Sequence, residues 1–300
     1  MRPNLSLLAG KQSGAFTWQQ ARVEYTRPEI ETRISRGHWV RVFRGVYRHQ
    51  NRQPTPLLTL EAARLSMDAS SVIACRNTAA QLHGISVVDD PTVHLLTPDS
   101  RMTRRRSGLI VHRDHIEECD LVQVGTATAT TALRTAIDTA RTSDRLDALA
   151  ILDLALRNGL GRSALTEELE LHAGKRGCRH VAELLDYADP RAESPMESRT
   201  RLRCIDAGLP RPELQVVVRA RGIVRRLDLG WERWKIGLEY ESKEWHSGPD
   251  APSRDNPRHN WLQDLGWQMF YVGPNQVYRA PHEFTDPIRR SIARKQRSSA

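Results

Sequence analysis

Apolar and polar positions near the start of the chain predict a small helix-turn-helix followed by a β-hairpin. Thr17 is a suitable capping residue for a short helix over residues 18–23. Pro28 begins a second helical pattern, in which isoleucines recur at helical spacing, and Gly37 ends it. Residues 39–48 then alternate apolar and polar side chains, which is typical of a hairpin. This order of elements predicts a winged helix-turn-helix.

The next part of the chain alternates helices with short strands. Two prolines within residues 51–60 indicate a linker into it. The helical patterns cover residues 58–67, 76–85 and 130–159, and the strand patterns cover residues 92–97 and 108–113. These patterns predict a mixed α/β domain in the middle of the chain.

The last third of the chain reads as a compact α/β unit. A polar, proline-bearing stretch over residues 187–201 marks its entry, and a helix is expected to start near Pro195. Two strand-like runs, over residues 216–230 and 234–242, are followed by a charged loop, a helix, a strand and a final helix. The predicted fold class is therefore α/β, with a winged helix-turn-helix over residues 1–50, a mixed α/β middle domain over residues 51–190 and a third domain over residues 191–300.

Composition fits this division. The 300 residues are too many for one average core, and 39% hydrophobic with 27% charged residues is typical of a soluble globular protein. No apolar run approaches membrane-spanning length, and the start of the chain lacks a signal-peptide core, so we expect a cytoplasmic protein without a membrane partner. Four scattered cysteines without a CxxC pair argue against a zinc ribbon and a disulfide framework.

The charge is strongly positive, and arginine supplies most of it. The formal net charge is +9, and 40 of the 45 basic residues are arginine. Arginine forks pair with phosphates and read guanine edges, which favours a polyanionic partner such as DNA. An arginine-rich genome composition, with the charges solvated on helix faces, explains the same numbers, so both interpretations stay open here.

Carboxylates gather in the two strand-like runs of the last domain. Glu239, Glu241 and Lys243 alternate along one run and so point to the same face. Asp228 lies on the preceding run, and a hairpin through residues 230–235 would bring it beside Glu239. Hard divalent cations such as Mg²⁺ prefer carboxylate oxygens, and such an ion can activate water for phosphodiester hydrolysis. A solvated strand face is the alternative interpretation of these carboxylates.

These residues resemble a known nuclease family. Asp on one strand and Glu-x-Lys on the next is the signature of the PD-(D/E)xK, restriction-endonuclease-like nucleases. The sequence is more similar to the branch related to the very-short-patch repair endonuclease, because SPMESRTR, LDLG, EYES, His246, DNPRHNWL and GW occur in that branch's order across residues 190–290. The resemblance implies a restriction-endonuclease-like fold for residues 191–300.

The resemblance also implies site residues. Asp228 and Glu239 would be metal ligands for Mg²⁺ or Mn²⁺, and Glu241, where the superfamily has lysine, would ligate the metal or hold a water. Glu197, on the entry helix, would face the metal or its water.

Three further positions carry over, with two departures from the pattern. His246 would act as a general base or bind the scissile phosphate, and Arg258 would pair with a phosphate. Lys243 is a substitute for the missing lysine on the same face. Ser242 replaces the expected glycine. These departures leave open whether the domain cleaves DNA or is an inactive scaffold.

The N-terminal region resembles a second family. The ending GHWVRVFRGVYR is similar to the winged-helix domain of AbiEi-type antitoxins, the transcriptional repressors of type IV toxin–antitoxin systems, and RNTAAQLHGI and TTALRTAIDTA resemble segments that accompany it. The match covers residues 5–190. In such a domain the second helix, here residues 27–35, enters the major groove. The predicted DNA-binding residues are Arg27, Arg33, Arg36, Arg41 and Arg44.

Three functions remain open from the sequence. The main hypothesis is a DNA-binding protein whose last domain is an Mg²⁺-dependent DNA endonuclease. The alternative is an AbiEi-like transcriptional regulator or antitoxin with an inactive nuclease-like domain, whose partners would be its own promoter and a toxin. An interaction protein that does not bind DNA is the third. The sequence leaves the oligomeric state open.

Overall fold

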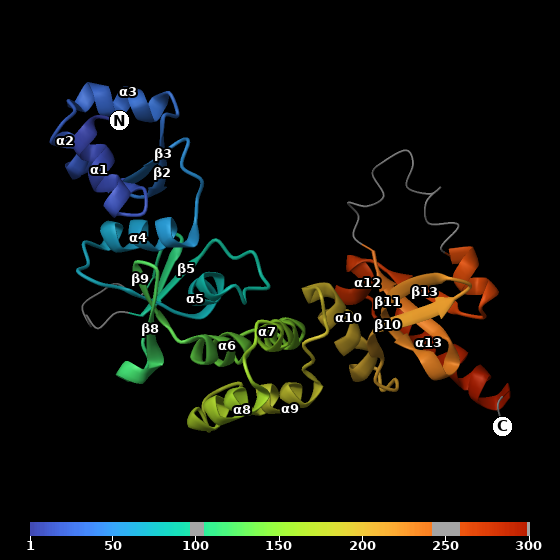
Figure 1. Ribbon diagram of the computed structural model, residues 1–300. Coiled ribbons are helices and arrows are strands. Elements are labelled where there is room, and N and C mark those ends of the chain that lie inside the picture. The colour runs from blue at the N-terminus through green and yellow to red at the C-terminus, as the bar shows by residue number, and fades with distance from the viewer. Residues whose placement is uncertain (97–104, 242–258, 299–300) are drawn as a thin grey trace. The chain divides into compact units, whose positions relative to one another are not determined.

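The structure is a computed structural model that describes residues 1–96, 105–241 and 259–298. The chain divides into two compact units, Met1–Thr139 and Ala140–Ala300, which are described separately (Figure 1). Both mix helices with sheets, as the sequence predicts. The expected domain boundaries after residues 50 and 190 each fall inside one of these units, and both boundaries stay predictions.

The first unit begins with short helices around a small sheet. The elements are α1 (Pro3–Lys11), β1 (Ala15–Thr17), α2 (Trp18–Arg22), α3 (Arg27–Ser35), β2 (Trp39–Phe43) and β3 (Val46–His49). The sheet has the order β1-β3-β2 with antiparallel pairing throughout. The two central helices and the hairpin lie where the sequence places them. α1 and β1 were not predicted.

The helix α4 (Pro56–Met67) links this small sheet to a larger one. Its Ala62 packs with Ala15 and Val46 of the small sheet, and Leu60 and Ala63 belong to the core of the next sheet (Figure 1). The expected linker over residues 51–60 is therefore shorter than predicted. Thr55 caps α4 by accepting a hydrogen bond from Leu58 N–H at 3.2 Å, and Pro56 fits the first helical position, so the helix starts there.

The larger sheet has six strands in the order β6-β7-β5-β4-β9-β8. Its pairs β5–β7 and β4–β9 are parallel, and the others are antiparallel. Helix α5 packs against β5 and β9. The elements are β4 (Ile73–Ala74), α5 (Arg76–His83), β5 (Val93–Leu96), β6 (Arg105–Arg106), β7 (Leu109–His112), a 3₁₀ turn (Glu118–Asp120), β8 (Leu121–Val124) and β9 (Ala127–Thr130).

The helix predicted over residues 130–159 is two helices, so that prediction was wrong. α6 (Ala132–Ala140) ends before a short turn, and α7 (Arg145–Arg157) begins after it. Asp144 causes the break, because its side chain accepts a hydrogen bond from Asp147 N–H at 2.9 Å and so caps a new helix.

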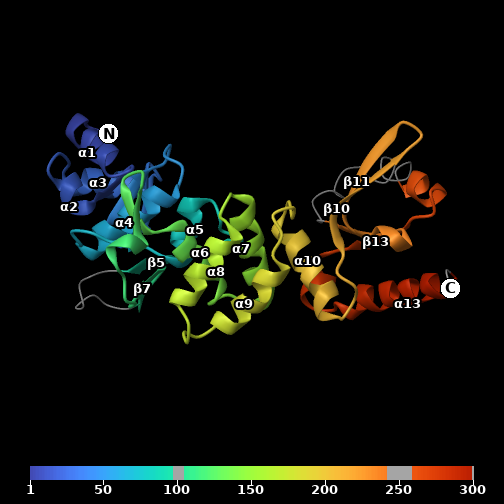
Figure 2. The same cartoon turned by 60° about the horizontal axis from the view of Figure 1, so that its bottom comes forward.

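The second unit combines helices with a four-stranded sheet of order β10-β11-β12-β13 (Figure 2). A core of buried apolar residues lies between this sheet and the helices α10, α12 and α13. The elements after α7 are α8 (Arg162–Leu171), α9 (Cys178–Tyr187), α10 (Pro195–Asp206), β10 (Glu213–Ala220), β11 (Ile223–Trp231), a 3₁₀ turn (Glu232–Trp234), β12 (Ile236–Tyr240), β13 (Gln268–Val272), α12 (Pro274–Tyr278) and α13 (His282–Ser298).

The run over residues 216–230, predicted as one strand, belongs to two. β10 and β11 pair antiparallel, and the chain reverses at Arg221 and Gly222, whose φ angles are 53° and 75°. A positive φ suits glycine and allows the tight turn. The second predicted strand is found as β12, which pairs antiparallel with β11 and parallel with β13. In the parts of the chain that the structure describes, no helix is long and apolar enough to cross a membrane.

Candidate functional site

The N-terminal helices present a polar face on a rigid aromatic core. Thr17 and Gln20 cap α2 reciprocally, with Gln20 N–H donating to Thr17 Oγ1 at 3.1 Å and Thr17 N–H to Gln20 Oε1 at 2.8 Å. Trp39 lies edge-on to Phe16 and to Tyr25, with ring centroids 4.9 and 5.1 Å apart. These contacts fix α3 against the hairpin that follows it.

The turn of the hairpin is held to the start of α2. Gly45 adopts a φ of 76°, which the tight β2–β3 turn needs, and its carbonyl accepts a hydrogen bond from Trp18 N–H at 2.8 Å. The turn therefore has a defined position relative to the two helices.

Three of the five arginines predicted to bind DNA are exposed and available. Arg36, at the end of α3, and Arg41 and Arg44, on the hairpin, are exposed, and none of them has an ion pair with any residue that the structure describes. Such guanidinium groups can contact phosphates without first breaking an internal ion pair.

The other two arginines have partners within the domain. Arg27 Nε donates to Glu31 Oε1 at 2.8 Å on the exposed face of α3. The Arg33 guanidinium lies over the Tyr25 ring, 4.9 Å from its centroid, and 5.8 Å from that of Trp39. Arg33 therefore contributes to the packing of the aromatic core, as cation–π contacts do.

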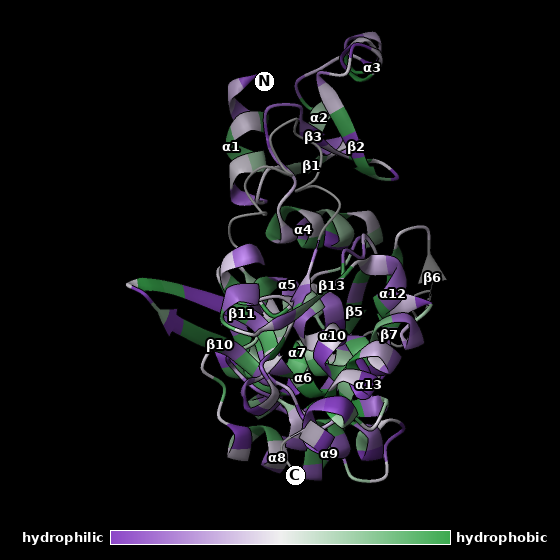
Figure 3. Cartoon of the chain, turned by 90° about the vertical axis from the view of Figure 1, so that its right-hand side faces the viewer, coloured by the Kyte–Doolittle hydropathy of each residue, from purple (hydrophilic) through white to green (hydrophobic). Residues whose placement is uncertain are grey.

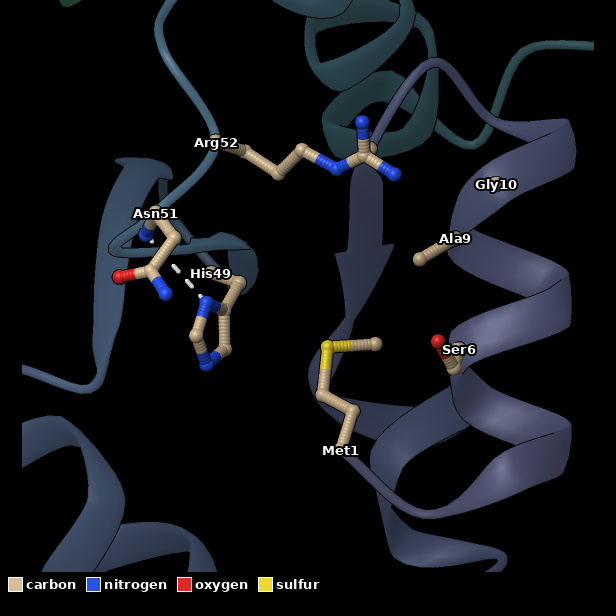
Figure 4. Close-up of a pocket in the computed structure, with 8 residues that line it drawn as sticks. Met1, Ser6, Ala9, Gly10, His49, Asn51 and Arg52 are labelled. Carbon is tan, nitrogen blue, oxygen red and sulfur yellow. Dashed lines mark hydrogen bonds between the residues drawn. The ribbon is translucent and has the colours of Figure 1, made fainter.

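A pocket of about 310 Å³ lies beside α1 (Figure 4). Asn51 N–H donates to His49 Nδ1 at 3.3 Å, and burial and neighbouring positive charges lower the pKa of His49. The lining contains no carboxylate to pair with this histidine, so the pocket offers no acid–base pair. It is lined by Met1, Ser6, Ala9, Gly10, Gly14, His49, Asn51 and Arg52.

Two histidines of the six-stranded sheet form a stacked pair that the sequence did not predict. His94 on β5 and His112 on β7 have ring centroids 5.1 Å apart and ring nitrogens 2.8 Å apart. Asp90 lies 3.1 Å from the other nitrogen of His94. Burial and nearby positive charge lower the pKa of His112 to about 4. These features describe an internal hydrogen-bond chain, in which Asp90 and the two rings orient one another.

The second candidate site is the carboxylate group of the second unit. Leu229 of β11 pairs with Leu238 of β12, and both belong to the core between the sheet and α10. Glu239, next to Leu238 along β12, therefore points to the opposite face. Tyr240 N–H donates to Asp228 Oδ2 at 3.1 Å. The predicted hairpin thus does bring the strands of Asp228 and Glu239 side by side.

Glu197 reaches the same region from the first turn of α10. Its carboxylate accepts hydrogen bonds from Glu193 N–H at 3.0 Å and from Gln215 Nε2 at 2.7 Å. Ser194 caps the helix by accepting from Glu197 N–H. Burial, together with the nearby negative charge of Asp228, raises the pKa of the Glu197 carboxyl.

The carboxylates do not form a ready metal site. Among the described residues, no three carboxylate, histidine or cysteine side chains converge closely enough to hold a metal ion. Glu197 is instead held by an amide and a backbone N–H. Glu241 is half-buried beside β13, with its N–H donating to Val272 O at 2.9 Å. The remaining candidates, Lys243, His246 and Arg258, lie outside the described residues.

Two arginines of the SPMESRTR motif have structural partners that sequence reasoning missed. Arg199 pairs with Asp147 of α7 at 2.8 Å, and Arg201 pairs with Asp153 of α7 at 2.7 Å. The second pair is fully buried. Both bonds join α10 to α7, which lies about fifty residues earlier, so no local signal could have identified them.

Comparison with known proteins identifies a domain in the middle of the chain. A family model described as the AbiEi antitoxin C-terminal domain matches residues 72–187, from the residue before β4 to the last residue of α9. This confirms the expected resemblance for the middle of the chain.

Two relatives that match this chain over almost their whole length show its family. The uncharacterized proteins MT2308 and Rv2248 of Mycobacterium tuberculosis strains CDC 1551 and H37Rv are each 39% identical over 271 residues, covering 90% of this chain and 98% of theirs. The chain belongs to the family of these mycobacterial proteins. The solved structure of the Rv2827c protein from the same species covers 73% of this chain and 87% of its own, at 14% identity and a TM-score of 0.41.

Proposed function

We propose that the protein is a DNA-binding regulator of the AbiEi antitoxin type. The match of residues 72–187 to the antitoxin domain carries this proposal. The helix-turn-helix and hairpin that precede the match support it, because Arg36 at the end of α3 and Arg41 and Arg44 on the hairpin are exposed and have no ion pair with a described residue. In this proposal residues 1–50 are a winged helix-turn-helix, and its partners are the protein's own promoter and a toxin.

In this proposal, different residues position the protein on DNA and recognise the base sequence. α3 enters the major groove, where the exposed Glu31 and Thr32 face base edges. Arg36 at the end of the helix and Arg41 and Arg44 on the wing contact the flanking phosphates, which sets register but carries no sequence information.

The test compares DNA binding by the full chain and two double variants. The probes are a duplex from upstream of the protein's own gene and a shuffled duplex of the same length. We expect the wild type to bind the upstream duplex more tightly than the shuffled one. Arg36→Gln/Arg44→Gln should reduce the magnitude of the slope of log K against log salt by about 1.8, because each lost phosphate contact accounts for about 0.9. Arg176→Gln/Arg179→Gln, which removes two exposed arginines of the α8–α9 region, is the matched control. Equal affinity for both duplexes would refute promoter recognition.

Metal-dependent DNA cleavage is a second candidate. The observation that favours it is the placement of Asp228 and Glu239 on adjacent strands, close enough to Glu197 for the charge of Asp228 to affect it. Mg²⁺ or Mn²⁺ would have to draw these carboxylates together, and Lys243, His246 and Arg258 would complete the proposed site. A supercoiled plasmid incubated with either ion, with Asp228→Ala and Glu239→Ala as controls, decides this. Nicking that both variants abolish establishes a nuclease, and DNA binding without nicking leaves the regulator alone.

A further inference from the structure

The β10–β11 hairpin continues beyond the sheet as a two-stranded ribbon (Figures 2 and 3). β12 pairs with β11 only at residues 229–231, whereas β10 and β11 stay paired to the turn at residues 220–223. Residues 217–226, here called the ribbon, therefore have each other as their strand partners.

The ribbon combines positive charge with exposed aliphatic side chains. From residue 214 to residue 227 the chain has four arginines and no acidic residue. Arg219, Arg221 and Arg225 are exposed, and none of them has an ion pair with a residue in the described part of the chain. Arg226 pairs with Glu193 at 2.7 Å on the surface, where such a bond contributes little.

The pairing register arranges these side chains in a pattern. Val217 lies opposite Arg226, and Arg219 lies opposite Val224, so one face alternates valine and arginine in both directions. The two valines are 42% and 49% exposed. Apolar side chains exposed in this way on a regular ribbon indicate a contact surface.

The charge selects the partner. A polyanion is complementary. The major groove of B-form DNA, about 12 Å wide, admits a two-stranded β-ribbon, whereas the deep, narrow major groove of double-stranded RNA does not.

We propose that the ribbon is a second DNA-binding element, which lies in a groove of duplex DNA without reading a particular sequence. Arg219 and Arg221 contact phosphates, and the two valines pack against the sugars, while Arg225, opposite Val218 on the other face of the ribbon, contacts phosphates along the groove wall. The ribbon belongs to the second unit, so this inference goes beyond the proposed winged helix and does not require promoter recognition.

The test measures binding of the full chain to a fluorescent 24-base-pair duplex of random sequence across a salt series. Arg219→Gln/Arg221→Gln/Arg225→Gln should lower the salt slope by about 2.7, at about 0.9 per contact. The lysine triple variant keeps the charge and should retain most of the slope, which separates charge from a folding defect. Arg176→Gln/Arg179→Gln is again the control.

Three outcomes would overturn the inference. The first is an unchanged salt slope in the glutamine triple variant, and the second is equally tight, equally affected binding of a double-stranded RNA of the same length. The third is a difference in molar mass between the wild type and the glutamine triple variant on light scattering, which would make the ribbon a contact between copies of the chain. The salt slope of the Arg36→Gln/Arg44→Gln variant on the upstream duplex tests the winged helix separately, so the two proposals can fail independently.

Discussion

Breaking the buried ion pair between α7 and α10 at one partner should strongly destabilise the second unit. Arg201 and Asp153 are 0% and 1% exposed, and Nη2 of Arg201 donates to both carboxylate oxygens of Asp153, at 2.7 and 2.9 Å. Burial raises the pKa of Asp153, whereas Arg201 favours its charged form. These two bonds, with a further hydrogen bond from Asp189 N–H at 2.7 Å, support the ionised pair.

The expected loss of stability depends on whether one partner of the ion pair or both are replaced. Arg201→Met keeps most of the volume but leaves a buried carboxylate without its cation, which costs about 3–5 kcal/mol of the free energy of unfolding. Arg201→Met/Asp153→Leu removes both charges and should lie within about 1 kcal/mol of wild type, because apolar replacement of a whole buried pair is often neutral.

Urea unfolding followed by tryptophan fluorescence measures this, since five of the seven tryptophans lie in the second unit. With a denaturant slope of about 1–3 kcal/mol per molar, the single variant should lower the midpoint by roughly 1–5 M. Arg289→Met, which breaks an exposed pair with Asp286 on α13, is the control and should cost less than about 1 kcal/mol. The reasoning is refuted if Arg201→Met matches this control, or if the double variant is as unstable as the single one.

Three further predictions follow from local geometry. Gly177→Ala should destabilise the second unit by at least about 2 kcal/mol in thermal unfolding, because its Cβ would lie 2.0 Å from Arg141 O, whereas Gly174→Ala, with open space around it, should cost about half as much. The pKa of His112 is lowered to about 4 in the folded protein, so the unfolded chain binds a proton at a higher pH than the folded one does. The stability contribution of neutral His112 should therefore be complete above about pH 6.5 and decrease as the pH falls toward 4. His112→Gln should make the melting temperature less dependent on pH in this range. A thiol reagent should label Cys119 alone in the native chain and all four cysteines in denaturant.

The sequence predicts the elements that local residues determine. Thr17 and Pro28 define helix starts, and the glycine after α3 adopts a φ of 73° where that helix ends. α1 escaped prediction because it buries only Leu5 and Ala9, too few positions for a recognisable apolar stripe.

The residues of the candidate site also differ in whether the local sequence determines their neighbours. Strand alternation and a short hairpin are local properties, so the neighbourhood of Asp228 and Glu239 could be predicted. The amide of Gln215 that holds Glu197, and the aspartates that bind the motif's arginines, come from remote segments. A motif match supplies residue types in order, but only tertiary contacts determine which of them face each other.

The helix α4 has a consequence for how such proteins can evolve. It presents Ala62 and Leu65 to the small sheet and Leu60 and Ala63 to the larger one. Because each residue advances a helix by about 100°, inserting one residue in its middle would turn one set of side chains away from its partner. Recombination that exchanged only residues 1–50 would likewise leave the small sheet without its covering helix. The N-terminal module and the six-stranded sheet should therefore be inherited together, with the length of α4 constant between them.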